Sequence, residues 1–363
     1  MISKRTIEEV FDTARVEEVI GDFVQLKKSG SNYKGLSPFT EEKTPSFMVS
    51  PAKQIWKDFS SGKGGTAVTF LMEHEQYTYP EAIKFIANKY GIEIEETQKT
   101  PEQKLQDDEK ESLFLISNFA KDYFKKSLLS EEGKSIGLSY LKERDFDQKM
   151  IDRFEIGYSP EKIDEFSDAA VNAGYKTNFL EKTGLTIVKE DKQIDRFRSR
   201  IIFPIKSMSG RVLGFGGRIL DNSKKNIAKY INSPESLIYQ KSKVLYGIFE
   251  GKQSIAKNDN CFLVEGYTDV IKMHQSGITN VVSSSGTALS ENQIRLISRL
   301  TKNITVLFDG DAAGSRAALR GIDLILSQDM NVQVCNLPNG EDPDSFVSEK
   351  KLEEIQDFFN SNS

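Results

Sequence analysis

The stretch from residue 259 to residue 346 constrains the fold most, because short apolar segments alternate there with segments of helical spacing. Apolar runs of this length are typical of buried strands. Strands and helices that alternate along a chain predict βαβ units around a parallel sheet. We expect strands at 261–264, 280–283, 304–308 and 332–337, and helices near 267–276, 290–300 and 312–327.

Acidic residues follow three of these expected strands. Ligands of an open parallel sheet lie beyond the carboxyl ends of its strands, so these side chains should gather at one edge. Crowded carboxylates repel one another unless a cation neutralises them, and oxygen ligands without His or Cys suit Mg²⁺ or Mn²⁺. One Asp-x-Asp is more often a turn or a helix cap, but three such strand ends predict a metal site for chemistry on phosphate esters. The acids are Glu265, Asp269, Asp309, Asp311, Asp342 and Asp344.

Positive charge is concentrated between residues 196 and 243. This segment holds eleven basic and two acidic residues and so carries +9, whereas the whole chain of 363 residues carries −5. Such an asymmetry can mark a surface that binds a polyanion, although a solvated surface is the simpler alternative. The basic residues interleave with strand-like and glycine-rich segments, which favours a built surface.

The length allows two or three domains, and the chain divides by composition. The first unit should contain a helix at 5–20, a strand at 23–26 and helices near 66–75 and 79–90. We expect an α+β and α/β multidomain protein with a small β-ribbon domain at 1–96, a linker at 97–111 that could continue into a solvated helix, a mixed α/β subdomain at 112–258, a βαβ parallel-sheet subdomain at 259–346 and the start of a helical region at 347–363.

Composition also excludes several classes of protein. No run of 18 apolar residues exists that could span a membrane, and the N-terminus is not a secretory signal. Cys261 and Cys335 lie far apart in apolar runs, so we expect reduced thiols in a cytoplasmic protein. Two cysteines and two histidines make a Cys/His zinc site very unfavourable.

The acidic motifs carry a family resemblance. Residues 265–270, 308–314 and 341–344 resemble the three acidic motifs of a Toprim domain, which occurs in bacterial primases, topoisomerases and some nucleases. The preceding segments at 196–205, 210–218 and 229–235, with Lys241 and 245–247, closely resemble the polymerase core of DnaG-type bacterial primases, and 33–36, 42–47 and 64–65 resemble the N-terminal domain of that family. The resemblance implies synthesis of short RNA primers from ribonucleoside triphosphates on single-stranded DNA.

The resemblance also assigns roles to basic residues. Arg144, Arg218, Lys229 and Lys241 would lie on a ridge that holds the template and the nascent strand by phosphate contacts. The neighbouring Arg196, Arg198 and Arg200 are further candidates for nucleic-acid binding. Gly214, Gly216 and Gly217 would let a nucleic-acid strand approach the backbone closely.

The acids would have unequal roles. Asp309 and Asp311 are the preferred metal ligands, and Asp269, Asp342 or Asp344 would complete or support the site. Glu265 would be a metal ligand or would take the proton from the attacking 3′-hydroxyl. The catalytic set is therefore Glu265, Asp309 and Asp311, without a finer division of labour.

The chain departs from the family at the zinc site. The family holds zinc by Cys-x₂-His and, about seventeen residues later, Cys-x₂-Cys; Ser37 and Thr40 stand at the first pair, and Asp58 and Ser61 at the second. Hydroxyls and one carboxylate are poor zinc ligands, so we expect no zinc. The ribbon should be held instead by packing of Phe39, Phe47, Trp56 and Phe59.

Other readings of the sequence stay open. The helicase-binding domain of the family does not fit into the residues after Phe346, so contact with the replicative helicase is in doubt. A catalytically weak module that binds single-stranded DNA is the first alternative to a primase. Another Toprim enzyme is the second, but it would leave residues 1–96 unexplained.

Overall fold

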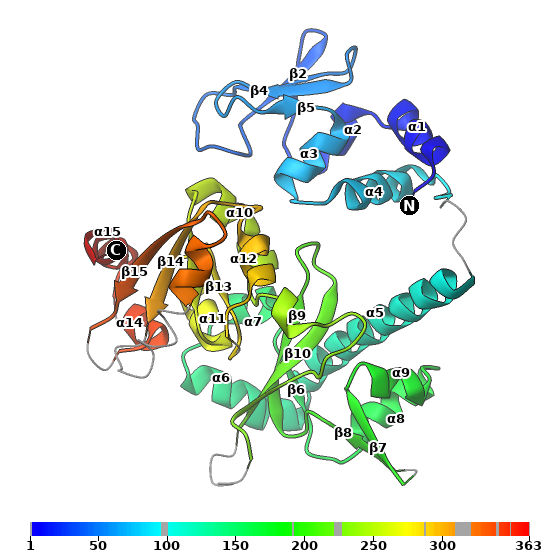
Figure 1. The fold of residues 1–363 in the computed structure, drawn as a ribbon, viewed down its shortest axis with the longest axis vertical. Coiled ribbons are helices and arrows are strands. Elements are labelled where there is room, and N and C mark those ends of the chain that lie inside the picture. The colour runs from blue at the N-terminus through cyan, green and yellow to red at the C-terminus, as the bar shows by residue number, and fades with distance from the viewer. Residues whose placement is uncertain are drawn as a thin grey trace. The chain divides into compact units, whose positions relative to one another are not determined.

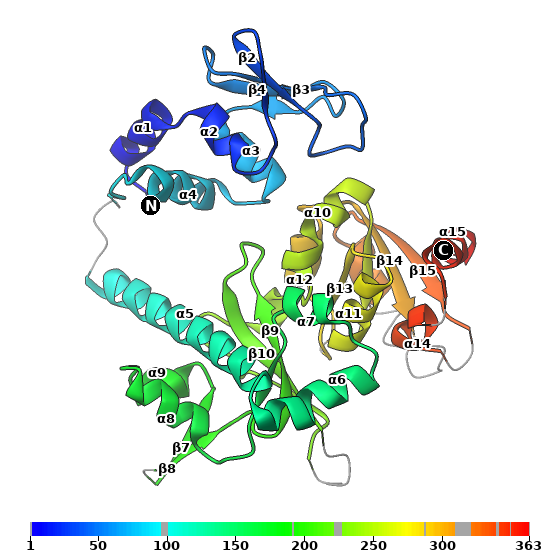
Figure 2. The same ribbon diagram turned by 180° about the vertical axis from the view of Figure 1, so that it is seen from behind.

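The computed structural model describes residues 2–95, 101–190, 192–220, 227–286, 288–308, 321–338, 341–348 and 350–362. The chain divides into two compact units, the N-terminal unit Met1–Lys104 and the core Leu105–Ser363. Figures 1 and 2 label the elements of both units from opposite sides. Within the described ranges, no helix has the length and apolar content to cross a bilayer.

The N-terminal unit is built on an antiparallel sheet of order β1-β2-β3-β4-β5. Val49 and Trp56 are partners across β3 and β4, and both are buried because alternate side chains of these strands face the core. The ring of Phe70, on α3, meets Trp56 edge to face with 5.7 Å between centroids. The elements are α1 (Lys4–Thr13), α2 (Val16–Gly21), β1 (Lys27–Ser29), β2 (Asn32–Gly35), β3 (Phe47–Ser50), β4 (Ile55–Asp58), β5 (Gly64–Gly65), α3 (Ala67–His74) and α4 (Tyr79–Tyr90).

Two predicted helices of this unit are confirmed, and their ends follow from local sequence. Helix α4 begins with a capping box of Thr78 and Glu81 and ends at Gly91, whose φ of 66° suits glycine. Thr66 caps the N-terminus of α3, because its hydroxyl accepts a hydrogen bond from the Thr69 amide.

Two other predictions in this unit are wrong. The helix predicted at 5–20 is two helices, because Arg15 is extended and the Val16 amide donates to the Gln54 side chain at 2.9 Å. The strand predicted at 23–26 is a turn, since the amides of Phe23 and Val24 both donate to the Ile20 carbonyl. In both places a tertiary or turn contact outweighs the apolar pattern.

The first part of the core is an antiparallel sheet of order β11-β10-β9-β6, accompanied by the hairpin β7-β8 and by helices. Helix α5 begins at Pro101, so the segment predicted as a linker continues into a solvated helix. The elements are α5 (Pro101–Leu128), a π-helical turn η1 (Gly133–Leu138), α6 (Ser139–Glu143), α7 (Gln148–Arg153), β6 (Gly157–Ser159), α8 (Glu165–Asn172), α9 (Thr177–Lys182), β7 (Thr186–Lys189), β8 (Lys192–Asp195), β9 (Arg200–Lys206), β10 (Val212–Ile219), β11 (Tyr230–Asn232) and η2 (Lys241–Lys243).

The second part of the core is the predicted parallel sheet, with the order β13-β12-β14-β15. Buried residues of α10 and α12 cover one face, and those of α11, α14 and α15 cover the other (Figure 1). The fold class predicted from the sequence is therefore confirmed. The elements are α10 (Ile248–Asn258), β12 (Cys261–Val264), α11 (Tyr267–Gln275), β13 (Val281–Ser283), α12 (Glu291–Ile297), β14 (Asn303–Phe308), β15 (Asn331–Asn336), α14 (Pro343–Ser348) and α15 (Leu352–Asn362).

Tyr267 joins the two parts of the core. Its ring stacks on Phe203 of β9 with 5.2 Å between centroids, and its hydroxyl donates to Asn232 at 2.6 Å. A Cβ on Gly216 would lie 2.4 Å from this ring, and one on Gly217 would lie 2.6 Å from Phe197. These glycines therefore make room for aromatic rings of the protein, rather than for a nucleic-acid strand as the sequence suggested.

Candidate functional site

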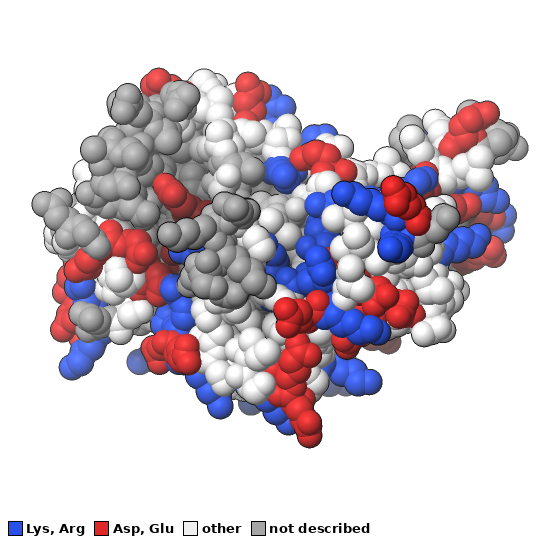
Figure 3. All heavy atoms as spheres, turned by 90° about the horizontal axis from the view of Figure 1, so that it is seen from below, with Lys and Arg blue, Asp and Glu red and all other residues white. Residues whose placement is uncertain are grey.

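A pocket of about 400 Å³ lies where the basic sheet meets the carboxyl edge of the parallel sheet. It brings together cations from the first part of the core and carboxylates from the second. Figure 3 shows Lys and Arg atoms gathered near the middle of one face of the molecule, with acidic atoms at their border. The lining residues are Arg144, Arg218, Lys229, Tyr230, Glu265, Gly266, Tyr267, Thr268, Asp269, Ser285, Gly286 and Asp342.

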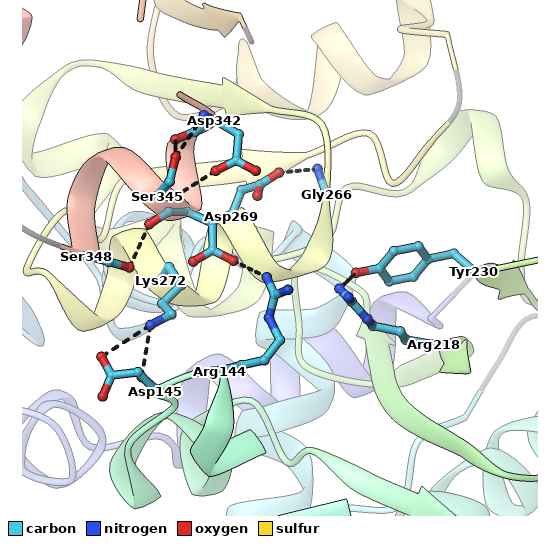
Figure 4. Close-up of polar contacts among 11 residues, drawn as sticks. Arg144, Asp145, Arg218, Tyr230, Gly266, Asp269, Lys272, Asp342, Ser345 and Ser348 are labelled. Carbon is cyan, nitrogen blue, oxygen red and sulfur yellow. Dashed lines mark hydrogen bonds and ion pairs between the residues drawn. The ribbon is translucent and has the colours of Figure 1, made fainter. Parts of the chain in front are cut away.

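Three of the predicted acids line this pocket. Glu265 follows β12 and is exposed, so its carboxylate is open to the pocket. Asp269 lies in the first turn of α11 and accepts a hydrogen bond from the Gly266 amide at 2.8 Å. Asp342 caps α14 by accepting from the Ser345 amide at 2.7 Å (Figure 4). The Asp342 carboxylate keeps lone pairs beyond this cap.

The preferred metal ligands of the sequence analysis, Asp309 and Asp311, lie outside the described residues. Among the described residues, no set of three His, Cys, Asp or Glu side chains is close enough to enclose an ion. The donors that do line the pocket are all carboxylate oxygens, which is the ligand chemistry of Mg²⁺ and Mn²⁺. The residues present therefore fit one side of such a site.

Asp344, also predicted as a metal ligand, has another partner. It is 8% exposed, and its carboxylate forms an ion pair with Arg144 of the segment after α6. Burial lowers the pKa of Arg144, but the charge and hydrogen bond of Asp344, together with Tyr140 and Tyr230, outweigh burial, so this pKa lies above its ordinary value. Asp342, and not Asp344, is the member of this pair that lines the pocket.

Arg218 is held between two tyrosines. Its guanidinium carbon lies 5.4 Å from the ring centroid of Tyr140 and 5.2 Å from that of Tyr230. Its Nη1 donates to the Tyr230 hydroxyl at 2.5 Å (Figure 4). Among the described residues, the Arg218 Nε and the Tyr140 hydroxyl have no hydrogen-bond partner although both atoms are buried. The guanidinium is thus fixed in place with donor capacity left over beside the pocket.

The other predicted nucleic-acid contacts differ in their surroundings. Arg200 is 4% exposed, and its Nη1 donates to the carbonyls of Gly217 and Lys229, both at 3.2 Å. Arg196 donates through Nε to the Gly184 carbonyl at 2.6 Å. Burial lowers the pKa of both arginines.

Arg198 and Lys229 are exposed, whereas Lys241 is half-buried, with its amide bound to Glu235 at 3.0 Å. Only Lys229 of these three lines the pocket.

The sequence analysis missed Tyr140, Tyr230, Thr268, Ser285 and Gly286. Tyr140 gave no signal, because its position depends on the packing of α6 against β10. Ser285 and Gly286 could have been found, since a polar run that follows the parallel strand β13 lies at the ligand-binding edge of the sheet.

In the N-terminal unit, the residues at the four zinc-ligand positions do come together. The Asp58 carboxylate is fully buried and accepts hydrogen bonds from the hydroxyls of Ser37, at 2.8 Å, and Ser61. The Thr40 hydroxyl is 2.6 Å from that of Ser60, which also donates to Asp58 at 2.9 Å. The oxygen atoms bind one another across the space that a metal would need, and none is a thiolate or imidazole, so this donor set does not fit zinc.

The predicted aromatic packing is only partly found. Phe39 and Phe47 stack on Trp56 with 5.5 and 5.4 Å between centroids. Phe59, in contrast, is 68% exposed, because it lies in the turn after β4 beyond the edge of this stack.

Comparison with known proteins first defines the class. Residues 262–347 match the Toprim-like family, in agreement with the parallel sheet and its acidic edge. Residues 123–252 match the DNA primase catalytic core, N-terminal domain, and residues 2–102 match the CHC2 zinc finger.

Sequence identity to individual proteins then identifies one family within this class of Toprim-containing proteins. The DNA primase of Halalkalibacterium halodurans is 40% identical over 98% of this chain, and that of Clostridium acetobutylicum is 38% identical over 96%. The zinc-binding and RNA polymerase domains of Aquifex aeolicus primase superpose with a TM-score of 0.66 at 35% identity, covering 99% of this chain and 85% of that structure. The chain therefore belongs to the DnaG-type DNA primase family. It spans 59% and 57% of the length of the two curated relatives.

Proposed function

We propose that this chain synthesises short RNA primers on single-stranded DNA, as a DNA-directed RNA polymerase that uses ribonucleoside triphosphates and Mg²⁺ or Mn²⁺. The observation that carries the proposal is the pocket in which carboxylates of the parallel sheet face cations of the neighbouring sheet. Template, nucleotides and product are all polyanions, so the cations bind phosphate while carboxylate oxygens are the ligands that a divalent metal ion prefers. The curated relatives are DNA primases, which supports this choice and a cytoplasmic location.

Each side of the pocket has its own task. Asp309 and Asp311 would hold the metal with Glu265, Asp269 or Asp342 completing the site, and the bound ion would lower the pKa of the attacking 3′-hydroxyl and neutralise phosphate charge.

Arg218 and Lys229 bind phosphate oxygens of the nucleotide or the strands, and the tyrosines keep Arg218 oriented. Glu265 is an exposed carboxylate at the pocket and is our candidate to accept the proton of the 3′-hydroxyl. A solved DnaG catalytic domain with a TM-score of 0.64 binds single-stranded DNA, which supports the choice of template.

Arg196 and Arg200 are not part of the interface that we propose. Their guanidinium groups bind backbone carbonyls of the core, so their role is to hold β9 and its neighbours in place. Arg198 and Lys241 remain candidates for contacts with DNA outside the pocket.

Primer synthesis on a single-stranded template tests the proposal. The wild-type chain should make short, metal-dependent RNA products from labelled ribonucleotides. Glu265→Gln should lower the rate at least 100-fold, because it removes charge at the metal while nearly keeping the side-chain shape. Glu291→Gln is the matched control, since Glu291 is an exposed acid of the same subdomain that pairs with Arg295 and does not line the pocket. Asp309→Asn should behave as Glu265→Gln does.

Two outcomes would overturn the proposal. The first is equal synthesis by Glu265→Gln and the control. The second is salt-sensitive binding of single-stranded DNA by the wild type without any product in Mg²⁺ or Mn²⁺, which would make the chain a binding module.

We also propose that the N-terminal unit works without zinc. The support is the donor set described above, in which hydroxyl and carboxylate oxygens are hydrogen-bonded to one another. Elemental analysis of chelator-washed protein should find far less than one zinc per chain, and one equivalent of zinc would refute this.

A further inference from the structure

The cluster of oxygen atoms around Asp58 also includes residues that are not at the four zinc-ligand positions of the family. The Ser46 hydroxyl, which is not at one of them, lies 3.3 Å from the Asp58 carboxylate, and the Ser61 amide donates to this carboxylate at 3.2 Å. Asp58 is the last residue of β4, so its side chain is fixed by the sheet. A carboxylate that is fully buried thus obtains donors on both of its oxygen atoms.

The hydrogen bonds of the Ser37 hydroxyl determine the direction in which it donates its proton. It accepts hydrogen bonds from the amides of Phe39 and Thr40, both at 3.1 Å, and these occupy its lone pairs. Its one proton therefore goes to Asp58. The turn that begins at Ser37 is built so that its hydroxyl serves the carboxylate.

A second carboxylate closes the same loop. Glu42 accepts from the amides of Ser37, at 2.7 Å, and Ser46, at 2.8 Å, and from the Ser46 hydroxyl at 2.6 Å. Ser46 therefore lies between Glu42 and Asp58. The loop 36–46 is tied at both ends to acceptors, and one of these also ties the loop 58–63.

We propose that the ionised Asp58 carboxylate is a metal-independent clasp that joins the loops 36–46 and 58–63, in the place where a zinc ribbon holds its ion. In a zinc ribbon, ligands from two loops converge on a cation and the binding free energy of the ion stabilises the fold. In this chain the central group has the opposite charge, because hydroxyl and amide protons converge on the Asp58 anion. Bonds to a charged acceptor are the stronger class of protein hydrogen bonds, which suits them to this task.

The electrostatics of Asp58 agree with this role. Burial by itself raises the pKa of Asp58, but hydrogen bonds from Ser61, Ser37 and Ser60 outweigh it, so the pKa lies below its ordinary value. The carboxylate therefore stays charged at neutral pH in spite of its burial. The clasp contains no thiol, so chelators and mild oxidants have nothing to act on.

The single tryptophan gives a local probe of the clasp in the full chain. Trp56 is 1% exposed and lies on β4, two residues before Asp58, so its fluorescence reports unfolding of the N-terminal unit alone. Asp58→Asn should lower the thermal midpoint of this signal by roughly 5 to 15 °C, because one acceptor oxygen becomes a donor among donors. Ser61→Ala, which removes one hydroxyl, should lower it by a smaller amount.

Asp195→Asn is the matched control. Asp195 is the corresponding buried carboxylate of the core, where it accepts hydrogen bonds from the amides of Phe166 and Ser167 at 2.7 and 3.0 Å. This variant should leave the Trp56 midpoint unchanged and lower the transition seen by far-ultraviolet circular dichroism. If Asp58→Asn fails to fold, Ser61→Ala and the control still measure the effect.

The converse experiment restores a metal. A variant carrying Ser37→Cys, Thr40→His, Asp58→Cys and Ser61→Cys should bind one zinc and show a Trp56 midpoint that falls on addition of a chelator. The wild-type midpoint should not respond to zinc or to the chelator. A wild-type midpoint that drops with chelator, or an Asp58→Asn midpoint within about 1 °C of wild type, would overturn the proposal. Neither readout depends on primer synthesis, so failure here is distinct from failure of the polymerase proposal.

Discussion

The polar side chains around Asp58 in the N-terminal unit bind one another, whereas those around Glu265 in the core face an open pocket. Both groups stand at positions where the family has a metal site. In the first group the hydroxyl donors match the carboxylate acceptors, so nothing is left over for a ligand. In the second group Glu265 is exposed and Arg218 keeps a buried Nε without a partner among the described residues. Internal satisfaction indicates a structural role, and unused capacity beside a pocket indicates binding.

The largest effect on stability is expected for a buried ion-pair group of the core, whose members also bind one another. Lys206 is 6% exposed and contacts Glu155 at 2.8 Å and Glu250 at 2.9 Å. Lys206→Met leaves both carboxylates without their central cation and should destabilise the core by about 3–5 kcal/mol. Denaturant unfolding followed by circular dichroism should show the loss, while the Trp56 signal keeps its midpoint.

Lys162→Met is the control for this variant. Lys162 is a solvent-exposed lysine that pairs with Asp164 and Asp168 at 3.6 and 3.8 Å. We expect it to change neither transition measurably. A fall of both transitions with Lys206→Met would show that the two units do not unfold independently, and the comparison would lose its basis.

Acid should destabilise both units, but the carboxylate that is responsible in the core differs from those in the N-terminal unit. Burial raises the pKa of Glu155, but bonds from Lys206 and then Lys125 outweigh burial and lower the pKa from 4.5 to about 2. A carboxylate whose pKa is lower in the folded state than in the unfolded state stabilises the fold at pH values above the unfolded pKa. This contribution is lost as the pH falls from about 4.5 toward 2. The loss is at most about 3 kcal/mol. Glu155→Gln should flatten the dependence of the core on pH in this window.

The N-terminal unit should keep its own acid dependence in that variant. The pKa values of Asp58, which forms the clasp, and of Glu42, which ties the same loop, both lie below their ordinary values, so their contribution is also lost in acid. Trp56 fluorescence should therefore titrate alike in wild type and Glu155→Gln. A Trp56 titration that changes together with the core would contradict the separation of the two networks.

The smallest expected effect concerns the pocket of the core. Tyr140→Phe keeps the ring beside Arg218 but removes a buried hydroxyl that has no partner among the described residues. If this hydroxyl binds a phosphate or orients Arg218, the KM for nucleotides should rise about 3- to 10-fold with little change in kcat. The free energy of unfolding of both units should change little, because the ring and its contact with Arg218 are kept.

Tyr175→Phe is the matched control for this substitution. Tyr175 is a tyrosine of the core whose ring contacts Phe119, 4.9 Å away, and it does not line the pocket. An unchanged KM in Tyr140→Phe would mean that this hydroxyl is as structural as those of the clasp.

Much of this organisation follows from local sequence. The parallel sheet was predictable because continuous apolar runs, such as 261–264, alternate with helical spacing. The acids at its edge were predictable because a carboxylate after a parallel strand must lie at the carboxyl edge. The resemblance to the family's zinc pattern also placed Ser37, Thr40, Asp58 and Ser61 near one another, and in the structure their side chains belong to one hydrogen-bonded cluster.

Sequence therefore determined which side chains gather, through strand order and periodicity, which are properties of the backbone. Only the tertiary structure decided how they pair. Asp342 and Asp344 are two residues apart, yet one lines the pocket and the other binds Arg144, 200 residues away in the chain. Arg218 and Arg200 belong to the same basic stretch, yet one faces the pocket and the other binds the sheet. The physical reason is that a charged side chain takes its role from the partner within about 3 Å, and packing of distant elements selects that partner.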